Sequence, residues 1–470
     1  MFDISDVQGN ILKGYRKPRV RHLILAVADA AEARAWLGAT VSGTGGVPQV
    51  TSQAPWETKP ATCFNIGLTF EGLRALGAAN SSLASFPTEF IEGMTARAIK
   101  LGDVGDSAPD KWPAPFDKPG DTHVIASIYA HEVDELDRIQ SAALQGTRTF
   151  RLLGVRDGFN FHGDYVHFGY HDNISQPRFK EVHDPGNYPD PQPMAPLGTV
   201  LLGYPNNFEG LFWRVPDPVA LGRNGAFNAF RVLAQDVAGF EAYLTEMAKY
   251  LLDHPDVDTL LPPGDEAKIG KDLSREAALR EIVAAQMCGR WRNGVPLALS
   301  PDTPHPQPPL PKMQRNNFDY PANSTCPYSS HIRRTNPRDG QIVQRVANNS
   351  RRLVRRGVPY GPQFDANNPG DATERGLLGN FIGASLGAQF EAMCTDWVNV
   401  GLQDPRVLGS NDPLIGANEA VAGWFDLVLK TGATIRLRGL PRFVTTRGGA
   451  YTFLPSITAL RYLGSLSKAA

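Results

Sequence analysis

An alternation of strand-like and helix-like segments in the first third of the chain constrains its fold most. Strands are predicted where β-branched and aromatic residues dominate, at residues 21–27, 63–70 and 123–130. Helices are predicted between and after them, at residues 30–37, 71–76 and 132–144. Strand, helix, strand, strand, helix, strand is the order of a ferredoxin-like unit. The pattern therefore predicts an α+β fold built on an antiparallel sheet.

The second half of the chain repeats this theme. It predicts, in order, a strand, a helix, a strand and a helix, at residues 225–233, 237–252, 377–383 and 385–397. Between them, residues 296–325 carry many prolines and little periodicity, which indicates a long irregular segment. The two halves share a pattern of elements, although their sequences do not visibly match.

The length of the chain and one proline-rich stretch indicate where the domains divide. A chain of 470 residues exceeds one ordinary hydrophobic core. Residues 184–193 hold prolines too dense for a helix interior or a central strand. We therefore predict two ferredoxin-like domains, residues 1–195 and 196–470, each an antiparallel sheet with peripheral helices.

Charge and cysteine content exclude several classes of partner. The net charge is −1, with 47 basic and 48 acidic residues, so no global field favours nucleic acid or an anionic membrane. No apolar run approaches the ~18 residues of a membrane span, and the first six residues lack a secretory pattern. The four cysteines form no CxxC pair and fit free thiols. A cytoplasmic protein is expected, with export or packaging left open.

His331 begins the most basic segment of the chain. Eight arginines lie between residues 333 and 356, with no lysine and with Asp339 as the one acid. Nucleic-acid sites usually add lysine and interleaved aromatic residues, which this segment lacks. A haem would offer iron to an imidazole and propionates to guanidinium groups. Composition alone leaves a haem site and a solvated basic surface as open alternatives.

A second candidate region holds three histidines, His162, His167 and His171. Their spacings of five and four residues bring them together on a metal only in a continuous helix. The glycines and the proline between residues 163 and 177 indicate a loop instead. A metal site made of these histidines is therefore disfavoured.

Segments spread over almost the whole chain resemble the dye-decolorizing peroxidases. The most specific are residues 326–338, which resemble the family's proximal haem motif, and 168–177, which resemble its distal motif, GxxDG followed by Ile-Ser-Gln-Pro. Further segments agree in the same order along the chain: residues 6–12, 223–237, 355–361, 389–391 and 412–416. A single GxxDG is weak, but the ordered set is specific.

The resemblance implies one haem b per chain, held mainly by the second domain, with His331 as the ligand of the iron. The other ring nitrogen of His331 should donate a hydrogen bond to an acid. Asp412 is the first candidate for that acid and Glu391 the second. Arg333, two residues past the ligand, would bind a propionate.

On the opposite face of the haem, the resemblance implies that Asp172 moves a proton between the two oxygens of hydrogen peroxide. Arg355 would supply positive charge to the departing oxygen and keep Asp172 ionised. Ile174, Ser175 and Gln176 would line the cofactor pocket beside them. An aspartate in this role predicts activity biased toward acidic pH.

The literal GxxDG pattern occurs elsewhere, at residues 154–158, where it would select Asp157. Asp172 is preferred because Ile-Ser-Gln-Pro follows it, although Asn173 stands where the family has glycine. Asparagine is among the residues that best tolerate positive φ. We therefore expect a preserved backbone with an added amide near the pocket.

The function implied is a haem peroxidase that uses hydrogen peroxide to oxidise bulky aromatic reductants, dyes and phenols, in one-electron steps. Bulky substrates would transfer electrons at the surface, where Tyr360 and Trp397 are similar to positions used by relatives, although core packing is the commoner role of such residues. A haem-handling protein with low turnover is the alternative that Asn173 suggests. An arginine-rich nucleic-acid binder is the third hypothesis.

Overall fold

The central N-terminal strands are built from apolar runs that are buried on both faces, whereas the edge strand is partly exposed. In this computed structural model, residues 2–145, 148–183, 194–208, 210–320, 325–338 and 351–466 are described. The first four strands are β1 (Arg19–Val27), β2 (Cys63–Leu68), β3 (Val124–Ala130) and β4 (Phe150–Phe159). They pair antiparallel in the order β4-β1-β3-β2, the ferredoxin-like order. Every residue of β2 and β3 is buried.

The helices that follow β1 and β3 begin at capped positions. Asp29 accepts hydrogen bonds from two backbone amides at the start of α1 (Ala30–Thr40). Glu132 and Glu135 form a reciprocal capping box at the start of α6 (Val133–Leu144). The shorter helices of this half are α2 (Phe70–Ala75), α3 (Asn80–Leu83), α4 (Thr88–Ala96) and α5 (Ala98–Leu101).

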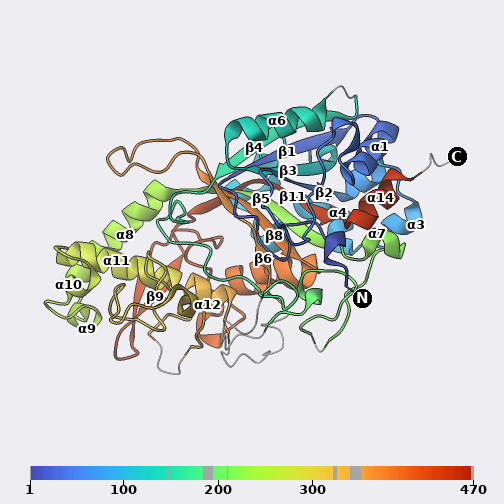
Figure 1. Ribbon diagram of the computed structural model, residues 1–470. Helices are drawn as coiled ribbons and strands as arrows, with labels where there is room; N and C mark the ends of the chain where they lie inside the picture. The colour runs from blue at the N-terminus through green and yellow to red at the C-terminus, as the bar shows by residue number, and fades with distance from the viewer. Residues whose placement is uncertain are drawn as a thin grey trace.

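The C-terminal half extends this sheet by a second set of strands with the same order. Its strands are β5 (Ala226–Gln235), β6 (Val354–Arg355), β7 (Val358–Tyr360), β8 (Gly376–Gly383) and β11 (Val444–Leu454). They pair antiparallel as β11-β5-β8-β6, with β7 also on β8. The two sets, called the first and second sheets below, join into one nine-stranded sheet where Phe453 of β11 pairs with Leu68 of β2. This confirms the α+β class with two ferredoxin-like units (Figure 1).

The C-terminal helix ties the two halves together. Helix α14 (Ile457–Gly464) packs against α1 of the N-terminal half, as Figure 1 shows at the right. A Cβ atom on Gly464 would lie 2.7 Å from Cα of Gly38, so this close approach requires glycine. The N-terminal segment is held in a similar way, because the side chain of Gln8 donates to the carbonyls of Ile66 and Pro455.

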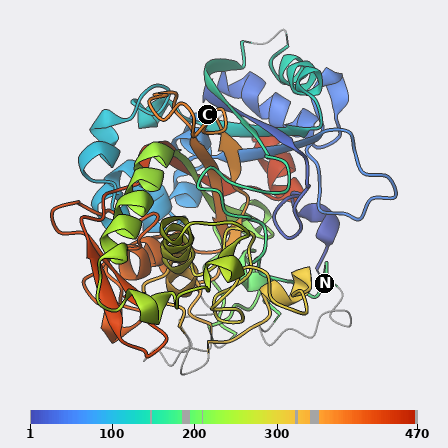
Figure 2. The same ribbon diagram turned by 90° about the vertical axis from the view of Figure 1, so that its left-hand side faces the viewer.

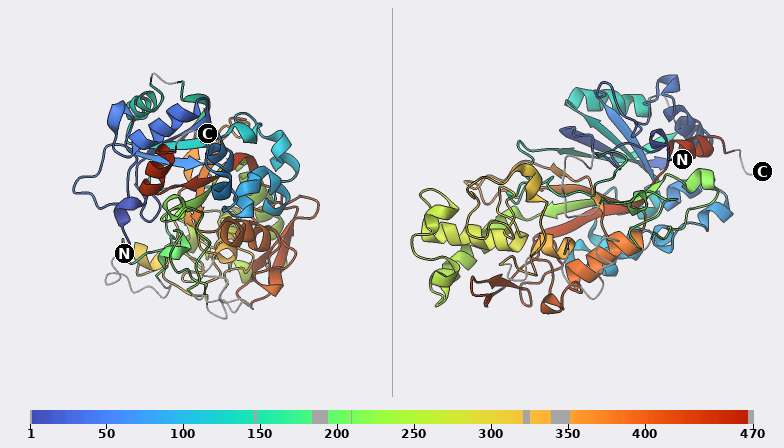
Figure 3. Two further views of the ribbon diagram at one scale, coloured as in Figure 1. Left: turned by 90° about the vertical axis from the view of Figure 1, so that its right-hand side faces the viewer. Right: turned by 60° about the horizontal axis from the view of Figure 1, so that its bottom comes forward.

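A lobe beside the second sheet holds its own hydrophobic core. It contains α8 (Val237–Leu252), α9 (Val257–Leu260), α10 (Glu266–Ile269), α11 (Arg275–Cys288) and the hairpin β9 (Trp424–Val428) and β10 (Thr434–Arg438). Figure 2 looks onto this lobe, and the right-hand view of Figure 3 shows it projecting from the sheets. The helix predicted at residues 237–252 is confirmed, whereas α11 and the hairpin were not predicted.

Two further predictions meet different outcomes. The segment at residues 385–397 is not an α-helix, because it forms two π-helical stretches, Leu386–Glu391 and Met393–Asn399. The proline-rich stretch at residues 184–193, which motivated the domain boundary, lies outside the described residues, so the boundary stays a prediction. Among the described helices, none is both long and apolar enough to cross a membrane.

Candidate active site

His331 is held by a buried carboxylate. It begins the short helix α12 (His331–Thr335), and its Nδ1 lies 3.0 Å from Oδ2 of Asp412. Asp412 is fully buried, and its Oδ1 accepts hydrogen bonds from the backbone amides of Leu414 and Ile415. A carboxylate fixed in this way makes Nδ1 the protonated nitrogen, so Nε2 carries the free lone pair that a metal requires.

The electrostatics of Asp412 favour its charged form. Burial alone raises the pKa of this carboxyl, but the hydrogen bond from His331, the charge of Arg334 and the amide of Ile415 oppose burial and lower the pKa. Asp412 therefore stays ionised at neutral pH inside the protein. An ionised acceptor raises the basicity of the histidine ring as a ligand.

Arg334 positions the elements around this pair, a role that the sequence did not reveal. Its guanidinium donates to the carbonyls of Ser329, Trp397 and Ser410. The side chain is completely buried, and desolvation lowers the pKa of Arg334 to about 10. It thus joins α12 to the segment that leads into Asp412.

Arg333 is stacked between two tyrosine rings. Its guanidinium carbon lies 3.6 Å from the ring centre of Tyr328 and 4.4 Å from that of Tyr320. Its Nη1 donates to the carbonyl of Cys326 at 2.5 Å. These contacts give Arg333 a structural role, and its predicted role as a propionate partner stays a prediction.

The distal loop is fixed by its buried aromatic residues. The Tyr170 hydroxyl donates to the carbonyl of Ala284 at 2.7 Å, and Arg292 donates to the carbonyl of Phe168 at 2.5 Å. Both rings are buried. The backbone amide of Asp172 donates to the carbonyl of Asp164 at 2.8 Å. Asp172 itself is exposed.

Arg355, at the end of β6, is joined to the residues that follow Asp172. Its Nη2 donates to the carbonyl of Ser175 at 2.5 Å. Its backbone amide donates to Oε1 of Gln176, and Nε2 of Gln176 donates to the carbonyl of Arg355 in return. The structure thus brings the predicted distal arginine onto the predicted distal loop, although 179 residues separate Arg355 from Gln176.

Arg355 and Asp172 interact electrostatically. Both residues are exposed. Desolvation lowers the pKa of Arg355, and the negative charge of Asp172 opposes that lowering. The carboxylate of Asp172 is therefore close enough to Arg355 for its charge to act on the guanidinium.

The turn after α11 contacts both the proximal and the distal segments. A Cβ atom on Gly289 would lie 2.5 Å from the side chain of Ile332, next to His331. A Cβ atom on Gly294 would lie 2.6 Å from the side chain of Ile174. Both glycines have φ near 90°, at 90° and 88°. The two halves of the candidate site therefore pack on one short turn.

Asn173 keeps the backbone that a glycine would adopt. Its φ is 63°, in the left-handed region, as expected. The Asn173 amide oxygen accepts from the guanidinium of Arg16, which pairs with Asp164 at 3.7 Å. The added amide is thus engaged by Arg16 rather than by Arg355 or Gln176.

Asp157, in the literal GxxDG pattern, belongs to β4. Both of its carboxylate oxygens accept from Arg21, at 2.8 and 2.7 Å. It forms a partly exposed ion pair on the first sheet, whereas Asp172 lies with Arg355.

The remaining predicted residues are placed elsewhere. Glu391 is engaged by Arg97, Lys100 and Tyr451, so Asp412 rather than Glu391 meets His331. Trp397 is only 4% exposed, so it is not a surface residue that a bulky substrate could contact. Tyr360 is partly exposed, and its hydroxyl donates to Glu374 at 3.0 Å.

The donor set fits a haem better than a bare metal ion. Among the described residues, no three His, Cys, Asp or Glu side chains form a group that could hold an ion. One histidine oriented by a carboxylate is the donor set that a porphyrin-bound iron needs from a protein. The guanidinium of Arg355, on which the carboxylate of Asp172 acts, fits the polar face of such a pocket.

Replacing Asp412 by asparagine is expected to lower the affinity for haem by about 10–100-fold. The amide would keep the shape but turn a donor toward Nδ1, which moves the ring proton to Nε2. Titration with hemin, followed by the Soret band, measures this loss. Asp404→Asn, which removes a nearby acid paired with Arg406, is the matched control.

Asp412→Asn should also change the stability of the protein, and this change should depend on pH because the pKa of Asp412 is lowered. A carboxyl with a lowered folded-state pKa stabilises the protein above its unfolded pKa of about 3.9, and the contribution is lost as pH falls through the folded value. Wild type and Asp412→Asn should therefore differ in thermal midpoint at neutral pH and converge below about pH 4. A constant difference across that range would contradict the assignment.

Comparison with known proteins agrees with this geometry. The family described as the DyP dimeric alpha+beta barrel domain matches residues 6–150. A dye-decolorizing peroxidase of Exidia glandulosa is 30% identical, and the alignment covers 97% of this chain and 86% of the relative.

Two solved structures share the fold over the whole chain. An ancestral D-type dye-decolorizing peroxidase superposes with a TM-score of 0.80 at 28% identity, over 99% of this chain and 100% of that one. A dye-decolorizing peroxidase in complex with 2,6-dimethoxyphenol superposes with a TM-score of 0.78 at 26% identity, with the same coverage. The chain therefore belongs to the dye-decolorizing peroxidase family, whose members are haem peroxidases.

Proposed function

We propose that this chain uses one haem b to reduce hydrogen peroxide and to oxidise aromatic compounds, dyes and phenols, in one-electron steps. The observation that carries this proposal is the 3.0 Å contact between Nδ1 of His331 and the buried Asp412, which readies Nε2 for iron. The structural relative in complex with 2,6-dimethoxyphenol supports phenols as reductants.

His331 would hold the haem through Nε2, and Asp412 would keep the ring oriented and basic. When bound, the haem supplies an iron that takes oxidising equivalents from peroxide and passes them to a reductant. Arg334 positions Asp412 by joining α12 to the chain at Ser410.

Asp172 would accept the proton of one peroxide oxygen and return it to the other, which then leaves as water. Arg355 would stabilise the negative charge that develops on the departing oxygen. The Ser175 carbonyl and the Gln176 amide hold the arginine in position, so little reorganisation is needed when peroxide arrives.

The two alternatives lose support. The low-turnover hypothesis rested on Asn173, whose backbone is preserved and whose amide is engaged by Arg16. The nucleic-acid hypothesis needs guanidinium groups on the surface, but Arg333, Arg334 and Arg338 are buried.

An absorption spectrum of the purified protein, before and after one equivalent of peroxide, tests the proposal. We expect a Soret band with haem, a shift on adding peroxide, and catalytic oxidation of 2,6-dimethoxyphenol. A Soret band without peroxide-driven turnover would favour the haem-handling alternative. Failure to bind haem would contradict the proposal as a whole.

We also propose a cytoplasmic location. The structure shows no disulfide among the four described cysteines, and three of them are buried. Cysteines without disulfides fit a reducing compartment better than an oxidising one. Cell fractionation with an antibody against the chain would test this, and recovery outside the cytoplasm would contradict it.

A further inference from the structure

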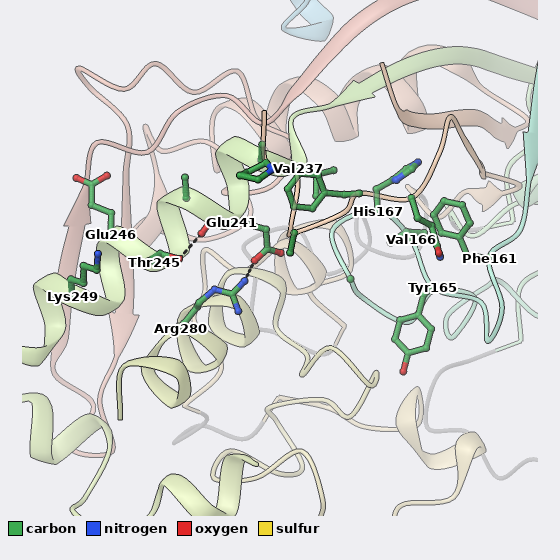
Figure 4. A pocket seen from close by; sticks show the side chains of 17 residues that line it. Phe161, Tyr165, Val166, His167, Val237, Glu241, Thr245, Glu246, Lys249 and Arg280 are labelled. Atoms are coloured by element: carbon green, nitrogen blue, oxygen red, sulfur yellow. Dashed lines mark hydrogen bonds and ion pairs between the residues drawn. The ribbon is translucent and has the colours of Figure 1, made fainter. Parts of the chain in front are cut away.

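A large pocket lies beside the residues that precede the distal motif. Its volume is about 850 Å³, within the range of sites for small organic ligands. The pocket is lined by residues 161–169, by α8, by Arg280 of α11 and by the loop at residues 363–369. Figure 4 shows Phe161, Tyr165 and His167 on one side and Glu241, Glu246 and Lys249 of α8 on the other.

The lining of this pocket is aromatic and electrically balanced. Phe161, Tyr165 and Phe364 supply rings, and small residues of α8, including Ala242, leave the space open. Aromatic rings recognise other rings through offset and edge contacts.

The charged groups of the lining offset one another. Glu241 forms an ion pair with Arg280, and Glu246 is matched by Lys249 one turn along α8. Desolvation lowers the pKa of His167, whose Nε2 donates to the carbonyl of Tyr360, so His167 is neutral at pH 7. The lining therefore favours an uncharged ligand.

Tyr165 connects the pocket to the distal residues. Its side chain is 37% exposed and lines the pocket. Its ring lies edge-on to the ring of His171, with centroids 5.6 Å apart, and the two residues also form a β-bridge. His171 directly precedes Asp172. Between a bound aromatic molecule and Asp172 would thus lie the rings of Tyr165 and His171, in edge contact with each other.

We propose that this pocket binds an uncharged aromatic reductant and that Tyr165 relays its electron toward the candidate active site. Oxidation of Tyr165 by the peroxide-oxidised enzyme removes one electron, which reduces the enzyme, and the phenolic proton, which passes through water to the oxygen that came from peroxide. A bound phenol then gives one electron and one proton back to Tyr165 and leaves as a phenoxyl radical. Two such cycles supply the two electrons and two protons that reduce one molecule of hydrogen peroxide to two waters. The relay rests on the proposed peroxidase function, whereas binding to the pocket does not.

Binding is tested with 2,6-dimethoxyphenol and the haem-loaded protein by isothermal titration calorimetry. Ala242→Trp fills the pocket with an indole and should weaken binding by at least about tenfold. Tyr165→Phe keeps the ring and should bind almost as wild type. Tyr250→Phe, an exposed tyrosine of α8 outside the pocket, is the matched control and should change nothing. A retained Soret band and thermal midpoint show that Ala242→Trp is folded.

The relay is tested by kinetics and by electron paramagnetic resonance after one equivalent of peroxide. Tyr165→Phe should lower kcat for 2,6-dimethoxyphenol by at least about tenfold, with KM nearly constant. It should also remove a tyrosyl radical signal that Tyr250→Phe retains. If Ala242→Trp binds 2,6-dimethoxyphenol as wild type does, the pocket is not the binding site. If Tyr165→Phe keeps both the tyrosyl radical signal and the wild-type kcat, Tyr165 does not relay the electron. If wild type binds the phenol but not haem, the proposed function fails and the pocket stands.

Discussion

Replacing His331 by alanine is expected to abolish stable haem binding. Among the residues that the structure describes, this imidazole is the candidate iron ligand that a buried carboxylate orients, with Nδ1 at 3.0 Å from Oδ2 of Asp412. Loss of a metal ligand should exceed the about 10–100-fold loss of affinity that follows removal of its hydrogen-bond partner. Titration with hemin should therefore give little Soret absorbance at concentrations that saturate wild type.

Two controls separate the loss of a ligand from the loss of the fold. His305→Ala removes an exposed histidine of the loop before His331 and should keep full haem binding. Free imidazole added to His331→Ala should restore part of the Soret band, because the vacated space faces the haem. If His331→Ala kept the band at its wild-type position, another residue would be the iron ligand.

The sheets could be predicted where apolar residues cluster locally. Strands β1, β2, β3, β5 and β8 were predicted, because short runs of apolar residues mark each of them, whereas the partly exposed β4 was not. Strand β11 was not predicted, because it contains Gly448 and Gly449 and shifts register beside them. Helix α11 was not predicted, because every residue of its last two turns is buried and no polar face marks a helical period.

The π-helical segment shows a different limit. Its apolar spacing over residues 385–397 predicts an ordinary helix, since so short a run cannot separate the two helical periods. Tertiary contacts then set the geometry. The side chain of Gln389 donates to the carbonyls of Thr199 and Arg352. Glu391 forms ion pairs with Arg97 and Lys100. These partners lie far away in the sequence, so no local pattern contains them.

The candidate site followed from resemblance rather than from spacing. His331 and Asp412 are 81 residues apart, and only the fold brings them together. Composition was ambiguous for the arginine-rich segment, because a buried and a solvated arginine look alike in a sequence. The structure separates them: Arg334 is completely buried and donates to backbone carbonyls, whereas Arg355 is exposed and donates to the carbonyl of Ser175.

Replacing Asp172 by asparagine should slow the reaction with peroxide by about 10²–10⁴-fold while haem stays bound. The amide has nearly the same shape but cannot take a proton from peroxide. The hydrogen bond from the backbone of residue 172 to Asp164 does not involve the side chain, so the loop should keep its conformation. Stopped-flow absorbance at the Soret band measures the rate directly, before any reductant is added.

Asp157→Asn is the matched control for this substitution, because it makes the same chemical change in the literal GxxDG pattern. Asp157 pairs with Arg21 on β4 and is about half exposed, with 51% of its side chain accessible. An exposed ion pair contributes about 0–1 kcal/mol to stability, so this variant should fold and react with peroxide as wild type does. The reverse result, a slow Asp157→Asn and a normal Asp172→Asn, would move the proton-transfer role to β4. A slow rate in Asp172→Asn alone would place that role on the distal loop, next to Arg355.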